Sequence, residues 1–588
     1  MGLSLLQDRM RGIMIQLQTK FSRQVDEHNV LPEYPRPSLV RTSYLNLNGR
    51  WECAFSKTPE IPLSFDLSIL VPFSPECQLS GVSRQLKPGE YLWYRRTITL
   101  AKPQQDKRIL LHFGAADQTA EVFVNRISAV RHCGGYLPFS ADITDYLQEG
   151  DNELIVRIQD ESNTSWHARG KQSLKPGGMF YTAQSGLWQT VWMEYVPKNY
   201  IKTTKITPDI DNGKVDVLVT LEGDNSAVAE VKAVAKLDGF TVSETVAKVC
   251  GKSAQFELPI PDAKLWTLEE PTLYDLELAA GQDIAVAYFG MRSVSINGSA
   301  IELNHKPVFQ RLVLDQQYFP DGIYTAKDDE TLIRDIELSK AAGFNGARMH
   351  MKVFEPRYIY HADKLGYLLW GEFPNWGLDE KDPASLLSIV PEWLTEIDRD
   401  YNHPSIIGWC PFNETSERRN KDVLRTVYNL THALDPMRPV IDTSGFVHVV
   451  TDIYDVHDYE QDPAKFHDHF TALVTGEGTP FINNPRHEKY EGQPYFVSEF
   501  GGTYWNIDED PSAAWGYGQA PKTIEEFYER FEGLINVLLD NPKICAFCYT
   551  QLTDVYQEKN GIFAFDRRSK FDLEKLHKIM SRKAAIEK

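Results

Sequence analysis

The sequence predicts a multidomain protein with an N-terminal β jelly roll, an immunoglobulin-like β-sandwich and a C-terminal (β/α)8 TIM barrel. The chain of 588 residues is too long for one hydrophobic core, so several domains are expected. Short strand-like runs fill the first half, whereas strand-like and helical runs alternate after about residue 297. These two patterns favour β-sandwiches followed by a parallel α/β fold.

The first part of the chain, residues 34–197, carries many short runs rich in aromatic and β-branched residues. Turn-forming residues separate runs such as YLWYRRTITL, TAEVFVN and WQTVWMEYV, a spacing typical of a jelly roll or β-sandwich. A second strand-rich segment, residues 198–296, has the length of an immunoglobulin-like sandwich. For residues 1–33, an N-terminal helix and a tail both stay open as interpretations.

Residues 297–588 alternate between strand-like runs, such as VFQRLVLD and SIIGWCPFNE, and helical runs, such as DDETLIRDIELSKAAG. Repeated β-then-α units predict a parallel sheet, and the length of this part suits a (β/α)8 barrel. A doubly wound open sheet is the competing topology. Since no G-x-G-x-x-G follows a first strand, a dinucleotide site is not expected.

Composition and charge exclude several classes of partner. The formal net charge of −20 argues against nucleic acid, because binders of polyanions need positive charge. No run of about 18 apolar residues exists, so no membrane span is expected.

The N-terminus lacks the unbroken apolar core of a secretory signal, so a cytoplasmic location is expected. The isolated C-x-x-C of Cys545 and Cys548 is interpreted as part of a buried strand.

In a barrel of this kind the active residues lie at the carboxyl ends of the strands. Carboxylates dominate the candidates at the predicted strand ends, and no nucleophile-elbow G-x-S-x-G is present. These candidates are Asp315, His350, Glu372, Asn413, Glu414, Tyr459, Glu499 and the segment 549–554.

Glu414 and Glu499 each follow an apolar strand-like run, and Gly501 and Gly502 come directly after the second. One glutamate at a strand end is more often part of a structural ion pair, but two on one barrel favour a catalytic pair. Two carboxylates flanking a glycosidic bond are the usual requirement for its hydrolysis, because one protonates the leaving oxygen and the other attacks the anomeric carbon. The sequence therefore predicts a glycosidase centred on these two residues.

The run RDYNHPSIIGWCPFNE, from Arg399 to Glu414, resembles the acid/base signature of glycoside hydrolase family 2. That family includes β-galactosidases, β-glucuronidases and β-mannosidases. SGLWQTVWMEYVP resembles the strand that closes the family's jelly roll, and LWTLEEPTLYDLEL resembles part of its sandwich. The similarity spans about residues 35–571 and implies the same domain order as the strand and helix pattern.

The resemblance implies that Glu414 is the acid/base and Glu499 the nucleophile of a retaining double displacement. It also implies that Asn413 binds the sugar 2-hydroxyl and that Tyr459 donates to the nucleophile. His350 lies where the family often has a histidine that contacts the sugar.

The chain departs from the family pattern at three places that bear on the sugar. Asp315 stands in RLVLDQQ, where the family often has Arg-Gly-Val-Asn-x-His. Tyr549 stands in place of an expected tryptophan. EKNG, with Lys559 before Asn560, does not reproduce the Asn-x-Lys with which β-glucuronidases bind a uronic carboxylate. We expect Asp315 and Tyr549 to contact substrate, and Trp505, close to Glu499 in sequence, is a further candidate.

Three other features receive structural interpretations. His403 is expected to be a hydrogen-bonding residue at the base of a strand. Arg348 is expected to pair with a carboxylate, with Glu372 as the candidate. The cluster at His467 and His469 is interpreted as solvated, because zinc sites need more ligands at defined spacing.

The leading hypothesis is a retaining exo-β-glycosidase with β-galactosidase-like chemistry, acting on a terminal non-reducing sugar with no cofactor and no metal ion. A β-glucuronidase, a galacturonidase or a furanosidase on the same scaffold is the first alternative. A non-catalytic carbohydrate-binding protein and a metal-dependent barrel hydrolase are alternatives of other classes. The expected partner is a glycoside or oligosaccharide. Homo-oligomerisation and the identity of the sugar stay open.

Overall fold

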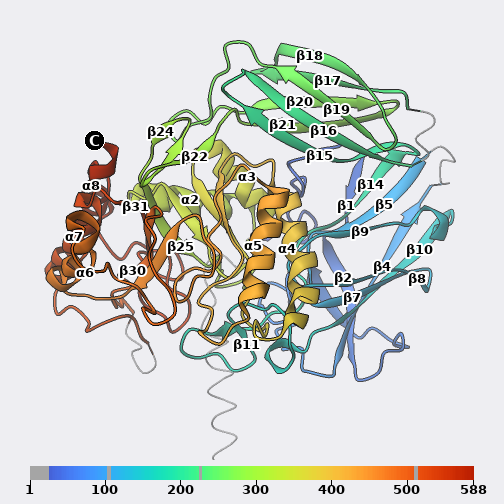
Figure 1. Cartoon of the computed structure of the whole chain (residues 1–588). Helices are drawn as coiled ribbons and strands as arrows, with labels where there is room; N and C mark the ends of the chain where they lie inside the picture. Colours follow the sequence, from blue (N-terminus) through green and yellow to red (C-terminus); the bar gives the residue numbers. More distant parts are fainter. Residues whose placement is uncertain (1–24, 102–106, 224–227, 509–513) are drawn as a thin grey trace, which may run out of the picture.

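The computed structural model describes residues 25–101, 107–223, 228–508 and 514–588, and they fold into three parts (Figure 1). The two β-rich parts lie at the right and the top of the view, and the α/β part lies at the left and centre. Most of the predicted N-terminal extension, residues 1–24, lies outside the described residues. Val30 and Leu31, at the end of that extension, are buried.

Two antiparallel sheets form the first part, one of six strands in the order β3-β2-β4-β10-β7-β8 and one of four strands in the order β1-β14-β5-β9. Apolar side chains from both sheets share one core, in which Trp51 and Leu111 are buried. The strands are β1 (Tyr44–Asn46), β2 (Gly49–Ser56), β3 (Leu67–Val71), β4 (Tyr91–Leu100), β5 (Lys107–Phe113), β6 (Ala116–Asp117), β7 (Thr119–Val124), β8 (Ile127–Cys133), β9 (Phe139–Asp142), β10 (Gly150–Gln159), β11 (Gln172–Ser173), β12 (Tyr181–Thr182), β13 (Gly186–Leu187) and β14 (Val191–Pro197).

The second part is a sandwich of a three-stranded sheet, β15-β16-β19, and a four-stranded sheet, β18-β17-β20-β21. Burial alternates along these strands, as period-two patterning requires when one face packs on a core. The strands are β15 (Tyr200–Asp209), β16 (Lys214–Glu222), β17 (Glu230–Leu237), β18 (Phe240–Lys248), β19 (Ser253–Pro259), β20 (Tyr274–Ala280) and β21 (Asp283–Phe289).

The third part is a barrel of parallel strands, which excludes the doubly wound alternative. Seven strands pair in the order β28-β27-β26-β25-β31-β30-β29. Between β28 and β29, residues 440–444 run parallel to the β28 region through bridges at Trp409–Val440 and Asn413–Ser444. The strands are β25 (Gln310–Asp315), β26 (Gly346–Met349), β27 (Leu368–Glu372), β28 (Ile406–Cys410), β29 (Tyr454–Asp458), β30 (Tyr495–Phe500) and β31 (Ile544–Tyr549), preceded by the short β22 (Val294–Asn297), β23 (Ala300–Leu303) and β24 (Lys306–Pro307).

Helices cover the outside of the barrel, and several begin at a side chain that caps the first turn. The Asp328 side chain accepts from the Thr331 backbone N–H at the start of α2, and the Thr523 side chain accepts from the Glu526 backbone N–H at the start of α7. These bonds satisfy backbone donors that have no partner within the helix. The helices are α2 (Asp329–Ala341), α3 (Pro356–Leu365), α4 (Leu386–Asp400), α5 (Lys421–Leu434), α6 (Pro463–Thr475), α7 (Ile524–Asp540) and α8 (Leu573–Met580).

Packing on the two faces of the barrel wall is close enough to require glycine at two neighbouring strand positions. A Cβ on Gly371 would meet the Trp409 ring at 2.4 Å, and a Cβ on Gly408 would meet the Trp370 ring at 2.4 Å. Each indole therefore lies against the backbone of the adjacent strand. This packing fixes β27 and β28, the strands that lead to Glu372 and Glu414.

A segment of the N-terminal domain reaches the mouth of the barrel. The backbone N–H groups of Arg169 and Gly170 both donate to the carbonyl of Trp376, at 3.0 and 3.2 Å. A Cβ on Gly170 would lie 2.3 Å from the Met351 carbonyl oxygen, so the approach needs glycine. The next residue, Lys171, is thereby placed beside the loop that follows β27.

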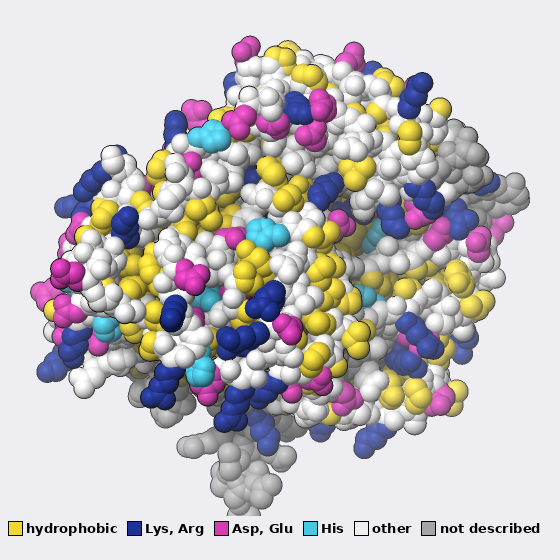
Figure 2. All heavy atoms as spheres, viewed as in Figure 1, with side chains coloured by type: hydrophobic (Ala, Val, Ile, Leu, Met, Phe, Trp, Pro, Cys, Tyr) yellow, Lys and Arg dark blue, Asp and Glu magenta, His cyan; other side chains and the backbone are white. Residues whose placement is uncertain are grey.

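Side chains of both charges are spread over the face drawn in Figure 2. Among the described residues, no helix is long and apolar enough to cross a membrane. The expected cytoplasmic location and the oligomeric state stay predictions.

Candidate active site

The two glutamates singled out by the sequence lie together at the carboxyl-terminal mouth of the barrel. Glu499 belongs to β30, and Glu414 follows β28 by four residues. The Glu414 side chain is 24% exposed and that of Glu499 is 7% exposed, so only Glu414 faces the solvent side. Glu414 has a φ of 51°, a conformation uncommon outside glycine, and its N–H donates to the Ser444 carbonyl at 2.9 Å.

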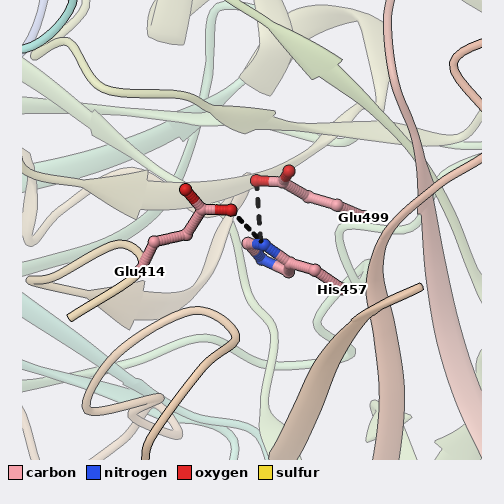
Figure 3. Close-up of side chains that lie close together, drawn as sticks. All are labelled: Glu414, His457 and Glu499. Atoms are coloured by element: carbon pink, nitrogen blue, oxygen red, sulfur yellow. Dashed lines mark hydrogen bonds and ion pairs between the residues drawn. The ribbon is translucent and has the colours of Figure 1, made fainter. Parts of the chain in front are cut away.

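Irregular strand pairing turns the key side chains inward. The β29–β30 register shifts between Val456 and His457, and the β30–β31 register shifts between Val497 and Phe500. Such shifts turn a side chain to the other face of the sheet from the one that regular alternation would give it. As a result His457 and Glu499 both point into the mouth of the barrel (Figure 3).

His457 lies between the two glutamates (Figure 3). Its Nδ1 is 2.8 Å from Glu414 Oε1, and its Nε2 is 3.4 Å from Glu499 Oε1. One ring nitrogen of His457 and one carboxylate oxygen from each glutamate all lie within 4.8 Å of one another. Burial lowers the pKa of the His457 imidazole, but Glu499 and Glu414 outweigh burial and raise that pKa above 6.5.

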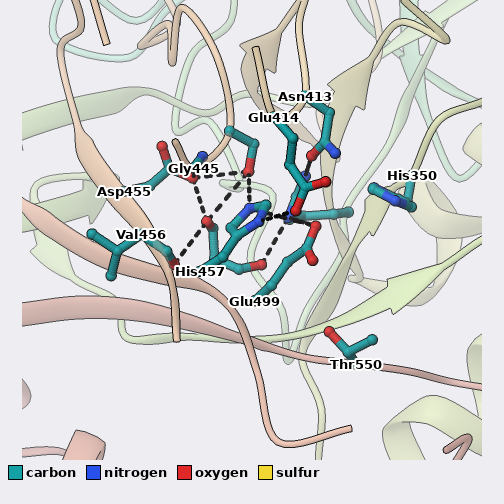
Figure 4. Close-up of polar contacts among 12 residues, drawn as sticks. His350, Asn413, Glu414, Gly445, Asp455, Val456, His457, Glu499 and Thr550 are labelled. Atoms are coloured by element: carbon teal, nitrogen blue, oxygen red, sulfur yellow. Dashed lines mark hydrogen bonds and ion pairs between the residues drawn. The ribbon is translucent and has the colours of Figure 1, made fainter. Parts of the chain in front are cut away.

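The hydrogen bonds around Ser444 show which nitrogen of His457 carries a proton (Figure 4). Ser444 Oγ donates to Asp455 Oδ2 at 2.8 Å. Burial alone would raise the pKa of the Asp455 carboxyl, but His448 and His457 outweigh it and hold that pKa below 3.8, so Asp455 is an acceptor. The Ser444 hydroxyl can then only accept from His457 Nε2, 3.0 Å away. Nε2 carries a hydrogen, and a second proton can be shared between Nδ1 and Glu414.

Glu499 is held as an anion. Tyr459 donates its hydroxyl to Oε2 at 2.6 Å, and Arg348 Nη1 donates to Oε1 at 3.2 Å. Burial would raise the pKa of this carboxyl, but the positive charges of His457, Arg348 and Lys171 help to lower it to about 2. At neutral pH the carboxylate is ionised, as an attacking group requires.

Arg348 orients three side chains at once. It donates through Nε to Glu372 and through Nη2 to Asn413 Oδ1 at 3.1 Å, in addition to Glu499. The Asn413 carbonyl accepts from Trp376 Nε1 at 3.1 Å. Because its amide oxygen is taken by Arg348, Asn413 keeps its Nδ2 as the donor available to a ligand.

Matches to known families agree with this geometry and with the domain order. The family model "Glycosyl hydrolases family 2, sugar binding domain" matches residues 78–193, "Glycosyl hydrolases family 2" matches residues 199–292, and "Glycosyl hydrolases family 2, TIM barrel domain" matches residues 294–582. The chain belongs to glycoside hydrolase family 2. It is therefore a glycoside hydrolase with a sugar-binding N-terminal domain, an immunoglobulin-like domain and a TIM barrel.

Curated relatives of this family 2 enzyme carry two activities in their names. The β-glucuronidase of Homo sapiens is 26% identical over 540 residues, which cover 82% of this chain and 80% of that protein. A putative β-glucuronidase of Formosa agariphila is 28% identical over 369 residues, which cover 59% of this chain and less than half, 44%, of that protein. The β-galactosidase of Thermoanaerobacter pseudethanolicus is 25% identical over 418 residues, covering 68% and 53% of the two chains.

Solved structures share the fold along nearly the whole chain. The β-glucuronidase from Ruminococcus gnavus in complex with D-glucuronic acid superposes with a TM-score of 0.76 at 21% identity, covering 93% of this chain and 99% of that chain. The β-D-glucuronidase of Dictyoglomus thermophilum has a TM-score of 0.74 at 21% identity, covering 93% and 98%. These matches establish the three-domain fold of the family 2 enzyme.

Three residues predicted for sugar contact lie near the glutamate pair. His350, 2% exposed, has Nδ1 3.3 Å from Glu372 Oε2, and burial lowers its pKa well below 6.5, so the ring is neutral. Tyr459 and Asn413 make the contacts described above. Figure 4 shows Asn413 next to Glu414, and His350 to the right of the two glutamates.

The structure does not bring Asp315, Tyr549 or Trp505 to the glutamate pair, which corrects the sequence-based expectation. In β25 the even-numbered positions, such as Leu314, pack inside the barrel. Asp315 therefore points outward, where it accepts from Tyr358 of α3 at 3.3 Å. A strand-end position alone does not determine whether a side chain faces the mouth, because successive residues alternate.

Tyr549 and Trp505 both pack against α7: Tyr549 faces outward from β31, whereas Trp505 lies in the loop after β30. The Tyr549 ring lies 5.3 Å from that of Phe531 in α7, in the layer between barrel and helices. The Trp505 ring lies 6.3 Å from that of Phe527, also in α7. The side chain that reaches the site from β31 is the next one, Thr550, whose Oγ1 lies 3.1 Å from the Tyr459 hydroxyl.

Sequence reasoning missed His457 and Lys171, and within the candidate segment 549–554 it singled out Tyr549 and not Thr550. His457 stands two residues before Tyr459, and that spacing on a strand could have placed both on one face. Lys171 belongs to another domain, so no spacing within the barrel could have indicated it. The structural interpretation of His403 agrees with its buried contact to Asp363, where Nδ1 lies 2.6 Å from Oδ2.

Proposed function

We propose that this family 2 enzyme is a retaining exo-β-glucuronidase that removes a terminal β-linked uronic acid. The observation that carries the retaining mechanism is the approach of Glu414 and Glu499, of which one carboxylate oxygen each lies within 4.8 Å of the other. Retaining enzymes hold the two carboxyl groups about 5–5.5 Å apart, whereas inverting enzymes need about 6.5–9.5 Å to admit a water. The short separation supports direct attack by one glutamate on the anomeric carbon.

Glu499 serves as the nucleophile in this proposal. Its anionic state, with a pKa of about 2, supports attack on the anomeric carbon to form a covalent α-linked glycosyl-enzyme. Tyr459 and Arg348 each hold one carboxylate oxygen and fix the direction of attack. Asn413 Nδ2 is the donor for the sugar 2-hydroxyl, where hydrogen bonds strengthen in the transition state.

Glu414 serves as acid and then as base, and His457 shares its proton. In the first step Glu414 Oε protonates the glycosidic oxygen as the bond to the sugar breaks. In the second step Glu414 removes a proton from water, which attacks the anomeric carbon and releases Glu499. The 2.8 Å contact between Nδ1 and Glu414 Oε1 supports His457 as the group that shares the proton with Glu414 before the first step and again after the second.

The choice of a uronic acid rests on the named relatives, since β-glucuronidases stand among both the curated proteins and the solved structures that this chain resembles. The β-galactosidase-like chemistry favoured by the sequence alone becomes the second candidate. One observation favours it: the buried carboxyl of Glu558 comes from the EKNG run, where β-glucuronidases are expected to carry Asn-x-Lys. A carboxylate there suits a hydroxyl better than a second carboxylate.

A panel of 4-nitrophenyl glycosides tests the proposal. We expect the highest kcat/KM with the β-D-glucuronide, and early product sampling by NMR should show the β-anomer first, as retention requires. A higher kcat/KM with the β-D-galactoside would show that the sugar is galactose and not a uronic acid, and would leave the retaining mechanism unchanged. An initial α-anomer would refute retention itself.

A further inference from the structure

Lys171 lies buried at the mouth of the barrel and, among the described residues, makes no direct ion pair. The residue is 8% exposed. Within the described ranges, no carboxylate lies within ion-pair distance of its ammonium group and no hydrogen bond fixes it. Lysine is rarely buried without a partner, because removing an ammonium group from water is costly. The ammonium lies instead 6.0 Å from the Tyr181 ring centre and 5.8 Å from that of Trp376.

Backbone contacts hold Lys171 at this place. The preceding Arg169 and Gly170 are bonded to the Trp376 carbonyl of the barrel, and the Lys171 carbonyl accepts from the Tyr181 N–H at 2.9 Å. The Gly170 backbone lies so close to the Met351 carbonyl that a Cβ would not fit. The junction between the two domains therefore fixes the backbone position of Lys171.

The position lies close to the glutamate pair. Trp376, beside the ammonium, donates to the carbonyl of Asn413, the residue before Glu414. The positive charge of Lys171 contributes to lowering the pKa of Glu499 and of His350. Such an effect needs a short separation through a poorly hydrated region. A sugar whose anomeric carbon is at Glu499 therefore lies within reach of the Lys171 charge.

We propose that Lys171 binds the carboxylate of the uronic acid, as a site contributed by the N-terminal domain in place of the Asn-x-Lys that the barrel lacks. The inference rests on the proposed β-glucuronidase function. A C5 carboxylate is the one group of a terminal hexuronide that carries a negative charge. This carboxylate would accept a hydrogen bond from the buried Lys171 ammonium, which lies near two aromatic rings. A hydrogen bond between charged groups is stronger than one between neutral groups.

Glu558 is the group that opposes this assignment. It is 2% exposed, accepts from the Tyr181 hydroxyl, and accepts from Asn560 Nδ2 at 3.0 Å. Burial raises its pKa, while Lys171, Tyr181 and Asn560 oppose that rise without cancelling it. The carboxyl therefore takes up a proton more readily than an exposed glutamate does, and a second carboxylate nearby favours protonation further. Binding of a uronate is expected to weaken at high pH, where Glu558 ionises.

The test compares two substrates that differ only in charge, 4-nitrophenyl β-D-glucuronide and its uncharged uronamide. For the wild-type enzyme we expect a kcat/KM ratio of acid to amide well above one. In Lys171→Met that ratio should fall by about 10- to 100-fold, the effect of losing a hydrogen bond to a charged group. Lys171→Arg should retain most of it. In Glu558→Gln the acid should remain a good substrate to higher pH than in the wild type.

Lys559→Met is the matched control, because Lys559 Nζ already lies 4.0 Å from Asp554 Oδ2 and its loss should leave the ratio unchanged. A wild type that cleaves the acid while Lys171→Met keeps the same ratio, with unchanged thermal stability, overturns the Lys171 assignment alone. A wild type that does not cleave the glucuronide overturns both the uronic-acid function and this assignment. A ratio that falls in Lys559→Met but not in Lys171→Met moves the site to Lys559.

Discussion

His457 Nδ1 lies 2.8 Å from Glu414 Oε1, and the other nitrogen of the same ring faces Glu499. One imidazole thus contacts both members of the glutamate pair. Its Nε2 hydrogen is directed by Ser444 and Asp455, so the proton that can move is the one between His457 and Glu414.

Replacing the nucleophile should abolish turnover and allow rescue by an external anion. We expect Glu499→Ala to lose at least about 10⁴-fold in kcat, since no other group can form the covalent intermediate. Azide should restore part of the rate by attacking from the vacated side, and mass spectrometry with NMR should identify an α-glycosyl azide. Glu525→Ala, an exposed glutamate of α7, is the control. Near-wild-type turnover of Glu499→Ala would refute the assignment.

Replacing the acid/base should give a defect that depends on the leaving group. Glu414→Ala is expected to lose about 10²–10⁴-fold on substrates with poor leaving groups, the usual contribution of a positioned proton donor. The first step should be much less affected with 2,4-dinitrophenol, which leaves without protonation. With azide this variant should form the β-glycosyl azide, opposite to that of Glu499→Ala. An equal loss on all leaving groups would contradict the acid role.

Removing His457 should narrow the pH range of activity from both sides. The His457 charge helps to lower the pKa of Glu499 to about 2, so His457→Asn raises that pKa and the acidic limb of kcat/KM moves to higher pH. The variant also loses one of the two groups that share the catalytic proton, so the basic limb moves to lower pH. The matched control is His469→Asn, because the His469 imidazole contacts Asp458 at 2.7 Å and neither glutamate of the pair. Unmoved limbs in His457→Asn would exclude a role in proton transfer.

Metal ions should inhibit and not activate. Glu414, His457 and Glu499 have the composition and spacing of a metal site, and two carboxylates with one imidazole bind Zn²⁺ readily. We expect activity to survive dialysis against EDTA and added Zn²⁺ to inhibit reversibly, with weaker inhibition in His457→Asn measured on its residual activity. Loss of activity on chelation, restored by a metal, would support the metal-dependent hydrolase instead.

The local pattern of the sequence was sufficient for the fold and for the glutamate pair. Alternation of burial along β16 and β20 and the β-then-α repeats after residue 297 come from periodicities that each segment carries by itself. Glu414 and Glu499 were found because each follows an apolar run, and the carboxyl ends of barrel strands meet at one mouth. Of the eight strands that a (β/α)8 barrel implies, the one between β28 and β29 is irregular, since isolated bridges replace a full ladder at residues 440–444.

Which side chains face the substrate was decided by tertiary structure alone. Asp315 and Tyr549 stand at strand ends, yet alternation turns them toward the helices, while register shifts turn His457 and Glu499 inward. Lys171 lies beside Trp376 at the mouth of the barrel only because its domain packs on the barrel at Gly170. A sequence encodes the period of each element, but one-residue shifts in register and contacts between domains arise only when the elements pack together.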